Sequence, residues 1–178
     1  MDVFQKCIDF KDADAVRSSG FYPYFRMIAS GQDPVVTMDG QRVIMLGSNN
    51  YLGLTNHPEI KQAAAEALEN YGTGTAGSRF LNGTLDIHVE LEEKLAQFMR
   101  REAALTFSTG FAVNLGVISS VIGRKDVVIL DNLDHACILD GARLSFGRVL
   151  KYPHNDKDSL EERLRSVEDD RSTLIVVD

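Results

Sequence analysis

The sequence predicts an α/β fold in which a mostly parallel sheet carries helices on both faces, preceded by an N-terminal arm and a β-hairpin. Two patterns favour this fold. From Pro58 onward, apolar runs of strand length alternate with stretches of helical periodicity, and such alternation is typical of parallel sheets with crossover connections. Nearer the N-terminus, the dipeptide Asp39-Gly40 separates two apolar runs, which is a strong hairpin signal.

Composition narrows the class of protein. The 178 residues are 44% hydrophobic and 25% charged, which is average for a globular domain with a sizeable core. The net charge of −7 argues against a nucleic-acid partner, which requires clustered Lys and Arg. No apolar run is long enough for a transmembrane segment. Cys7 and Cys137 have neither metal-ligand spacing nor a disulfide pattern, so we expect two free thiols in a cytoplasmic protein without a metal site.

The individual elements follow from periodicity and caps. The first 30 residues are expected to form an arm with an aromatic cluster at residues 21–25. The hairpin strands are expected at residues 35–38 and 42–46. Helices are expected at 58–72, after a cap at Thr84, at 111–122, at 136–144 and after a cap at Asp156. Strands of the parallel sheet are expected at 103–107, 126–131, 148–152 and 173–178. Because the chain stops at the end of a strand, we expect the protein to continue beyond Asp178.

A glycine-rich segment, Gly72–Gly77, matches the dinucleotide-binding pattern G-x-G-x-x-G. That pattern binds pyrophosphate only where it follows a strand and opens a helix. Here it follows a predicted helix, so a loop that exposes its backbone is favoured. A strand ending just before Gly72 would restore the nicotinamide-dehydrogenase alternative.

Ser108-Thr109-Gly110-Phe111 lies between a predicted strand and a predicted helix. Its backbone amides and the helix dipole could bind a phosphate at the carboxyl edge of the sheet without a charged side chain. An ordinary turn with a helix cap explains the same residues equally well.

A second polar segment, residues 131–135, follows the next predicted strand. Ligands of parallel sheets bind outside the carboxyl ends of the strands, so this segment and Ser108–Phe111 are expected to face one pocket. His135 could stack on an aromatic ring or transfer a proton. Alternatively, it is a loop histidine hydrogen-bonded to Asp131 or Asp134. Capping or exposure accounts for the remaining histidines, which are His57, His88 and His154.

Four separated segments in this order resemble the α-oxoamine synthases, a branch of the fold-type-I enzymes that use pyridoxal 5′-phosphate (PLP). The resemblance runs from about Gly20 to Asp178. It rests on Ser48–Leu54, Gly72–Thr84, Phe107–Asn114 and Leu133–Ala136. It implies that residues 1–46 form an N-terminal arm and small β unit, and that residues 47–178 form the first part of the PLP-binding large domain.

The same resemblance implies roles for individual residues. Ser108, Gly110 and Phe111 would bind the cofactor phosphate. His135 would be catalytic and would stack on the PLP ring. The substrate-binding residues would be Asn50, Tyr51, Ser78 and Arg79, partly from across the interface of a homodimer with a shared active site. The lysine that binds PLP covalently would lie beyond Asp178.

The implied reaction condenses an amino acid with an acyl-CoA, usually with loss of carbon dioxide. Within the family, residues 20–26 and 77–84 most resemble the bacterial serine palmitoyltransferases. Glycine C-acetyltransferase (2-amino-3-ketobutyrate CoA ligase) and 8-amino-7-oxononanoate synthase remain alternatives. So does a non-catalytic partner subunit that lacks the lysine.

Overall fold

A computed structural model describes residues 2–178. Contacts along the chain divide it into two compact units, one ending at Ala76 and the other comprising Gly77–Asp178. The family resemblance implies a different division, into residues 1–46 and 47–178. The two compact units do not test that division, and it stays a prediction.

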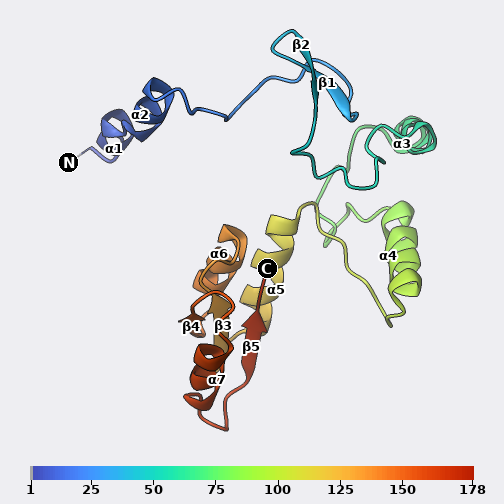
Figure 1. Cartoon of the computed structure of the whole chain (residues 1–178). Helices are drawn as coiled ribbons and strands as arrows, with labels where there is room; N and C mark the ends of the chain where they lie inside the picture. The colour runs from blue at the N-terminus through green and yellow to red at the C-terminus, as the bar shows by residue number, and fades with distance from the viewer. Residues whose placement is uncertain (1) are drawn as a thin grey trace. The chain divides into compact units, whose positions relative to one another are not determined.

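The first unit begins with two short helices, α1 (Gln5–Asp9) and α2 (Asp12–Ser18) (Figure 1). Neither helix contains a buried residue. The expectation of an arm without a core of its own agrees with this, but the sequence interpretation did not include the two helices. Helices this short are marginal in water, and hydrophobic periodicity barely signals them.

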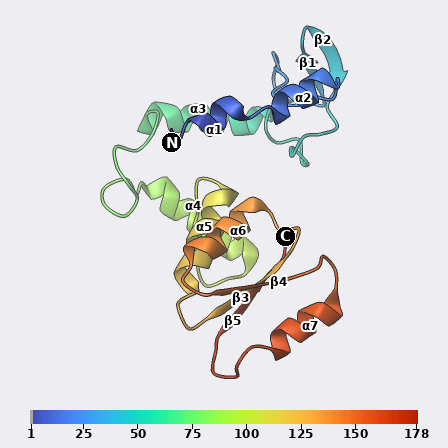
Figure 2. The same ribbon diagram turned by 90° about the vertical axis from the view of Figure 1, so that its left-hand side faces the viewer.

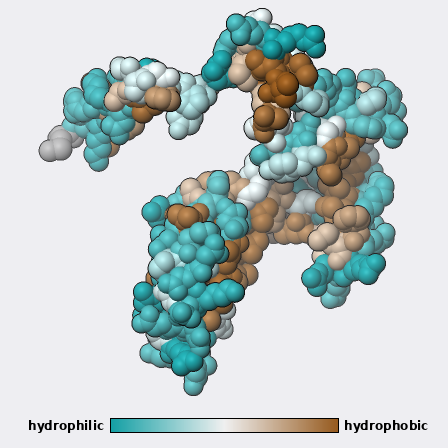
Figure 3. Space-filling model, in the orientation of Figure 1, coloured by the Kyte–Doolittle hydropathy of each residue, from teal (hydrophilic) through white to brown (hydrophobic). Residues whose placement is uncertain are grey.

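The predicted hairpin is present in the first unit. Strand β1 (Val35–Met38) pairs antiparallel with β2 (Gln41–Ile44), with Val35 opposite Ile44. The turn residues Asp39 and Gly40 have φ angles of 50° and 79°. A two-residue turn with both φ angles positive matches the twist of the strands and favours Asp-Gly. Apolar side chains are exposed over this hairpin, as the brown surface there shows (Figure 3).

Helix α3 (Pro58–Tyr71) follows, with proline in its first turn. It ends at Gly72, whose amide donates a hydrogen bond to the carbonyl of Leu68. A helix rather than a strand therefore precedes the glycine-rich segment, and this excludes the dinucleotide-binding alternative.

The second unit contains a parallel sheet with strand order β4-β3-β5. The strands are β3 (Val127–Asp131), β4 (Arg148–Tyr152) and β5 (Thr173–Val176). Helices α5 (Gly110–Val121) and α6 (Ala136–Leu144) cover one face of the sheet, and α7 (Lys157–Arg165) covers the other (Figure 2). The prediction of a mostly parallel sheet with helices on both faces is confirmed.

The central strand β3 is buried along its whole length, and alternate side chains enter two cores. Val128 and Leu130 pack against Ile118 and Ile138 of α5 and α6. Val127 and Ile129 pack with Tyr152, with Leu160 of α7 against them. An apolar run with no polar alternation is what a strand covered on both faces requires.

Two local predictions are wrong. Residues 103–107 form no strand and pair with none of the strands in the described chain, so Phe107 and Leu130 do not end adjacent strands. The amide of Thr106 instead donates to the Glu92 side chain at 2.8 Å. A segment forms a strand only where another strand is available for pairing, and local periodicity does not reveal that partner. Here the Glu92 carboxylate accepts the hydrogen bond that a neighbouring strand would otherwise accept.

The second correction concerns helix α4 (Asp86–Met99), which Thr84 does not cap. The Thr84 hydroxyl donates to the carbonyl of Arg79 at 2.6 Å. His88 Nδ1 accepts from the Leu85 amide at 3.0 Å at the start of the helix. By contrast, the predicted cap of α7 is confirmed, because Asp156 accepts from the Ser159 amide.

Candidate functional site

The N-terminus of α5 presents the backbone predicted to bind an anion. Thr109 has an extended backbone, and its hydroxyl accepts from the Ala112 amide at 3.1 Å. Gly110 and Phe111 are the first two residues of the helix, whose amides have no partner within a helix. Ser108 and Phe111 are exposed, and a Cβ built on Gly110 would meet nothing within 4 Å. These two amides are therefore oriented and accessible for an anion.

His135 occupies the equivalent position at the start of α6. Its Nδ1 accepts from the Cys137 amide at 3.1 Å and lies 2.9 Å from Cys137 Sγ. The ring thus caps the helix and remains exposed. The alternative of a hydrogen bond to Asp131 or Asp134 is not what the structure shows, since both short contacts of the ring are to Cys137.

The starts of α5 and α6 lie together at the carboxyl edge of the sheet. Asn114, one turn after Gly110, places its Nδ2 3.0 Å from Cys137 Sγ. Gly141 of α6 lies so close to α5 that a Cβ there would come within 2.7 Å of the Asn114 carbonyl oxygen. The absence of a side chain at Gly141 permits this approach. The amides of Gly110 and Phe111 and the ring of His135 are consequently on neighbouring helix ends, although no strand precedes α5.

A buried carboxylate, Asp131, ends the central strand just before the loop that carries His135. It accepts from the Leu133 amide at 2.8 Å, and His154 Nδ1 lies 3.1 Å from both of its oxygens. These hydrogen bonds, the Leu133 amide first, lower the pKa of Asp131 despite its burial. Asp131 therefore remains charged and anchors the loop.

The sequence interpretation missed this pair, although a signal was available. Asp131 is the polar end of an apolar strand, and His154 follows the end of the adjacent β4. The rule that placed His135 at the carboxyl edge places His154 there too.

Asp134 connects the same loop to the end of β5. Its two oxygens accept from the amide of Asp131 at 3.0 Å and from the amide of Asp178 at 2.9 Å. Burial raises the pKa of Asp134, and these two hydrogen bonds oppose the rise. The loop between β3 and α6 is thus held at both ends by carboxylates.

Arg79 and Ser78 lie in the loop before α4, where Arg79 is engaged by protein groups. Its guanidinium donates two hydrogen bonds to Glu92, at 2.6 and 2.9 Å, and one to the Thr106 hydroxyl at 3.2 Å. The Ser78 side chain is exposed, and its carbonyl accepts from the amides of the following turn. A hollow of about 370 Å³ adjoins the guanidinium. It is lined by Arg79, Phe80, Thr84, Leu105, Thr106 and Phe107.

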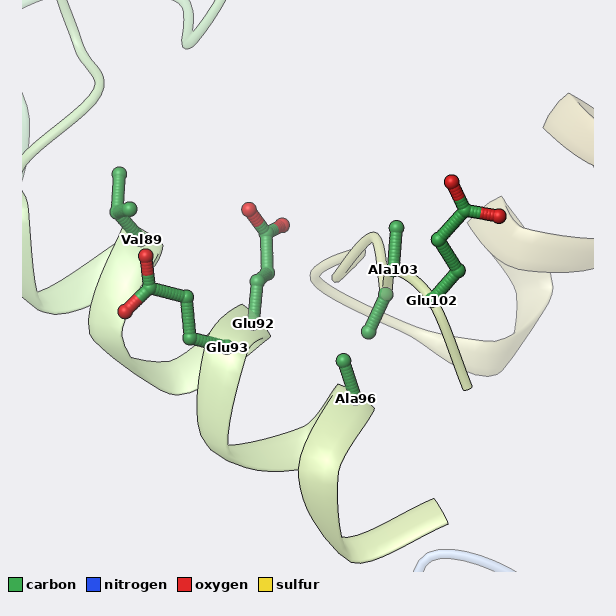
Figure 4. A pocket seen from close by; sticks show the side chains of 7 residues that line it. Val89, Glu92, Glu93, Ala96, Glu102 and Ala103 are labelled. Carbon is green, nitrogen blue, oxygen red and sulfur yellow. The ribbon is translucent and has the colours of Figure 1, made fainter. Parts of the chain in front are cut away.

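A second hollow, of about 240 Å³, lies between α4 and residues 102–104 (Figure 4). Glu92, Glu93 and Glu102 line it together with small side chains. The Glu92 carboxylate already accepts from Arg79 and Thr106, and none of the site residues predicted from the sequence lies here. It is not a candidate site.

Asn50 and Tyr51 belong to the first unit. The Asn50 side chain accepts from the Thr55 amide at 3.1 Å and donates to the Gln32 carbonyl at 3.3 Å, so it shapes its own turn. The Tyr51 ring is 85% exposed. Both remain proposed substrate-binding residues.

Two searches covered the described residues, 2–178. No group of three or more His, Cys, Asp or Glu in this range could hold a metal ion. None of its helices is both long and apolar enough to cross a membrane.

The fold and the site define an α/β protein in which an open helix start and an exposed imidazole lie at the carboxyl edge of a parallel sheet. The family model of aminotransferases of class I and II matches residues 41–178. The chain belongs to this family.

Two curated relatives indicate which members of the family the chain resembles. A serine palmitoyltransferase of Sphingobacterium spiritivorum is 56% identical over 169 residues, which cover 95% of this chain and 42% of that protein. An 8-amino-7-oxononanoate synthase of Geobacter sulfurreducens is 47% identical over 163 residues, covering 92% of this chain and 42% of that protein. The chain thus spans about two fifths of the length of these relatives.

Solved structures of serine palmitoyltransferases are similar to this chain in fold. The serine palmitoyltransferase of Sphingomonas wittichii matches with a TM-score of 0.91 and 34% identity, over 98% of this chain and 45% of that chain. A serine palmitoyltransferase solved with PLP matches with a TM-score of 0.92 and 35% identity, over the same shares of the two chains. The predicted resemblance to the α-oxoamine synthases and the predicted fold class are confirmed.

Proposed function

We propose that the whole protein is a PLP-dependent acyltransferase that condenses L-serine with palmitoyl-CoA, releasing CoA and carbon dioxide and giving 3-ketosphinganine. The observation that carries the choice of substrates is the 56% identity to a serine palmitoyltransferase over nearly the whole chain. The site at the carboxyl edge of the sheet supports the choice of cofactor.

The residues present fit PLP. The open space at Gly110 and the amides of Gly110 and Phe111 suit a phosphate dianion, which the positive end of the α5 dipole also favours. Ser108, exposed beside them, can donate its hydroxyl to the same group. The exposed ring of His135 can lie against an aromatic ring. When bound, PLP supplies an electron sink for charge that develops at the α-carbon of an amino acid.

The chain's own residues then bind the substrate and hold His135 in position. With Nδ1 occupied by the Cys137 amide, a neutral His135 carries its proton on Nε2. That N–H can donate to the carboxylate of an amino acid or to a carbonyl oxygen of the product. Asp131, His154 and Asp134 hold the loop on which the imidazole sits. In this proposal Asn50, Tyr51, Ser78 and Arg79 contact substrate.

Part of the proposal is a cytoplasmic homodimer with a shared site. The exposed aromatic side chains of Phe21, Tyr24 and Phe25 would give a monomer a large apolar surface in contact with solvent. Free thiols at Cys7 and Cys137 suit a reducing compartment. Light scattering at assay concentration tests the assembly, and an active monomer would contradict it.

The decisive assay measures CoA release by the whole protein with matched substrate pairs. We expect turnover with L-serine and palmitoyl-CoA to exceed that with L-alanine and pimeloyl-CoA. The second pair is the one 8-amino-7-oxononanoate synthase would prefer, and its 47% identical relative makes it the main alternative. Glycine with acetyl-CoA completes the panel.

A different outcome would support the partner-subunit alternative. In that case no pair releases CoA, and borohydride reduction with PLP adds no mass to any lysine. One pyridoxyl phosphate attached to a single lysine would exclude that alternative.

A further inference from the structure

Three side chains from two helices form a short hydrogen-bonded chain that ends at His135. The Asn114 amide nitrogen of α5 lies 3.0 Å from Cys137 Sγ, and Sγ lies 2.9 Å from His135 Nδ1. The backbone amide of Cys137 adds a second contact to Nδ1, at 3.1 Å. Cys137 is only 4% exposed, so water does not compete for its thiol.

The direction of each hydrogen bond follows from chemistry. A backbone N–H can only donate, so its contact at 3.1 Å favours the tautomer in which Nδ1 accepts and carries no proton, and a second donor at Nδ1 strengthens that preference. The NH₂ group of Asn114 can likewise only donate, so Sγ accepts from it. The S–H of Cys137 is then directed to the remaining neighbour, His135 Nδ1. All three bonds agree on one arrangement, with the imidazole proton on Nε2.

We propose that Cys137 and Asn114 are positioning residues that fix the tautomer and orientation of His135, so that Nε2–H is the donor presented to substrate. Cys137 places two donors, its backbone N–H and its thiol, at the one lone pair of Nδ1, which they share. Asn114 holds the thiol in the rotamer that reaches the ring. The inference deepens the proposed function and rests on it for the role of His135.

The packing of α5 against α6 makes the arrangement rigid. Gly141, one turn beyond Cys137 on α6, allows the backbone of α6 to approach the Asn114 carbonyl, where a Cβ would lie within 2.7 Å. Because Asn114 is also one turn from Gly110, the same contact couples the imidazole to the proposed phosphate-binding amides.

The test is to record the ring-nitrogen signals of His135 in the whole PLP-loaded protein labelled with ¹⁵N-histidine. Long-range ¹H–¹⁵N spectra distinguish a bare Nδ1 from a protonated one, and His135→Gln assigns the signal. We expect a bare Nδ1 in the unmodified protein. Cys137→Ala removes the thiol donor, and Asn114→Asp redirects the thiol toward a carboxylate of the same shape. Both should produce a population protonated at Nδ1 and lower kcat by about fivefold, the effect of one neutral hydrogen bond.

Cys137→Ser is the matched control, because a hydroxyl keeps a donor at the same place, and it should restore the bare Nδ1 and most of kcat. It also keeps the test decisive if Cys137→Ala fails to fold. A bare Nδ1 that persists unchanged in both Cys137→Ala and Asn114→Asp would overturn the inference, since the backbone amide alone would then suffice. Failure of the proposed function looks different, because the tautomer would still respond to the variants while no substrate pair released CoA.

Discussion

The carboxylate of Glu92 holds the guanidinium of Arg79 through two hydrogen bonds, from Nη1 to Oε1 at 2.6 Å and from Nη2 to Oε2 at 2.9 Å. Oε1 also accepts from the amide and the hydroxyl of Thr106. Glu92 therefore connects the loop containing Ser78 to the segment that leads into Ser108. These bonds, the one from Arg79 first, hold the pKa of Glu92 far below its ordinary value.

Glu92→Gln should lower the melting temperature by a few degrees, because the bidentate ion pair is lost and Thr106 keeps only a neutral acceptor. The sign with pH follows from a folded-state pKa below the unfolded one. The stabilisation by Glu92 is complete above its ordinary pKa of 4.5 and is lost as pH falls below it. Thermal melts of both proteins from pH 7 to pH 3 check this, and the difference between them should shrink in acid.

Glu93→Gln is the control for that variant, since Glu93 is the exposed neighbouring carboxylate on the same helix. An equal loss of melting temperature in both variants at pH 7 would contradict the assignment.

Gly110→Pro should weaken PLP binding by about tenfold or more without unfolding α5. Proline removes one amide proposed to donate to the phosphate, and a charge-assisted hydrogen bond is worth about 1.5–3 kcal/mol. Proline is tolerated at the first helical position, and the extended backbone of Thr109, with φ −149° and ψ 155°, suits a residue before proline. Fluorescence titration with PLP measures the affinity, and circular dichroism monitors the helix. Unchanged affinity in a folded variant would exclude this amide as a phosphate ligand.

Two substitutions at His135 separate catalysis from capping. His135→Asn keeps an acceptor for the Cys137 amide and should leave the melting temperature nearly unchanged. His135→Ala also loses the cap and should cost about 1 kcal/mol of stability. Both should reduce kcat by about 10²-fold and alter the visible spectrum of bound PLP. Turnover and spectrum that match the unmodified protein in His135→Asn would refute the role of the ring.

Asp134→Asn should destabilise the protein by about 1–3 kcal/mol at pH 4, because a carboxamide can accept from only one of the two amides that the carboxylate now serves, and by less at pH 7, where the variant also removes a buried charge. Burial raises the pKa of Asp134, so its charged form disfavours the folded state, and stability from this group falls as pH rises through the raised pKa. Urea unfolding at pH 4 and pH 7 measures both effects. A more stable variant at pH 7 would mean that the burial of the charge outweighs its hydrogen bonds.

His154→Ala should increase the mobility of the loop between β3 and α6, while lowering the melting temperature only slightly. Asp131 loses one partner but keeps the Leu133 amide, so the strand end remains anchored. Faster hydrogen exchange at the amides of residues 132–135 is the expected result. Asp131→Asn should have the larger effect, since it removes the charge that both partners stabilise. Exchange that is unchanged in both variants would show that the contact between His154 and Asp131 does not hold the loop.

Much of the fold could be predicted from the sequence, because caps, turns and periodicity act within a few residues. The boundaries of α6 and β4 match their predicted ranges, and the Asp39-Gly40 turn and the Asp156 cap form as expected. The buried run of β3 indicates in advance a strand covered on both faces. The expectation that Gly110 and His135 face one pocket assumed a strand at residues 103–107, which the structure lacks, and the contact between Asn114 and Cys137 brings the starts of α5 and α6 together instead.

The tertiary structure decided which side chains meet. His154 reaches Asp131 across 23 positions of sequence, and Arg79 reaches Thr106 across 27. Segment 103–107 has the composition of a strand, yet its Thr106 amide is satisfied by Glu92 rather than by a neighbouring strand. Local propensity gives each segment its preferred conformation. Strand pairing and hydrogen bonds between distant side chains instead depend on groups far away in the chain, whose arrangement only the packed structure determines.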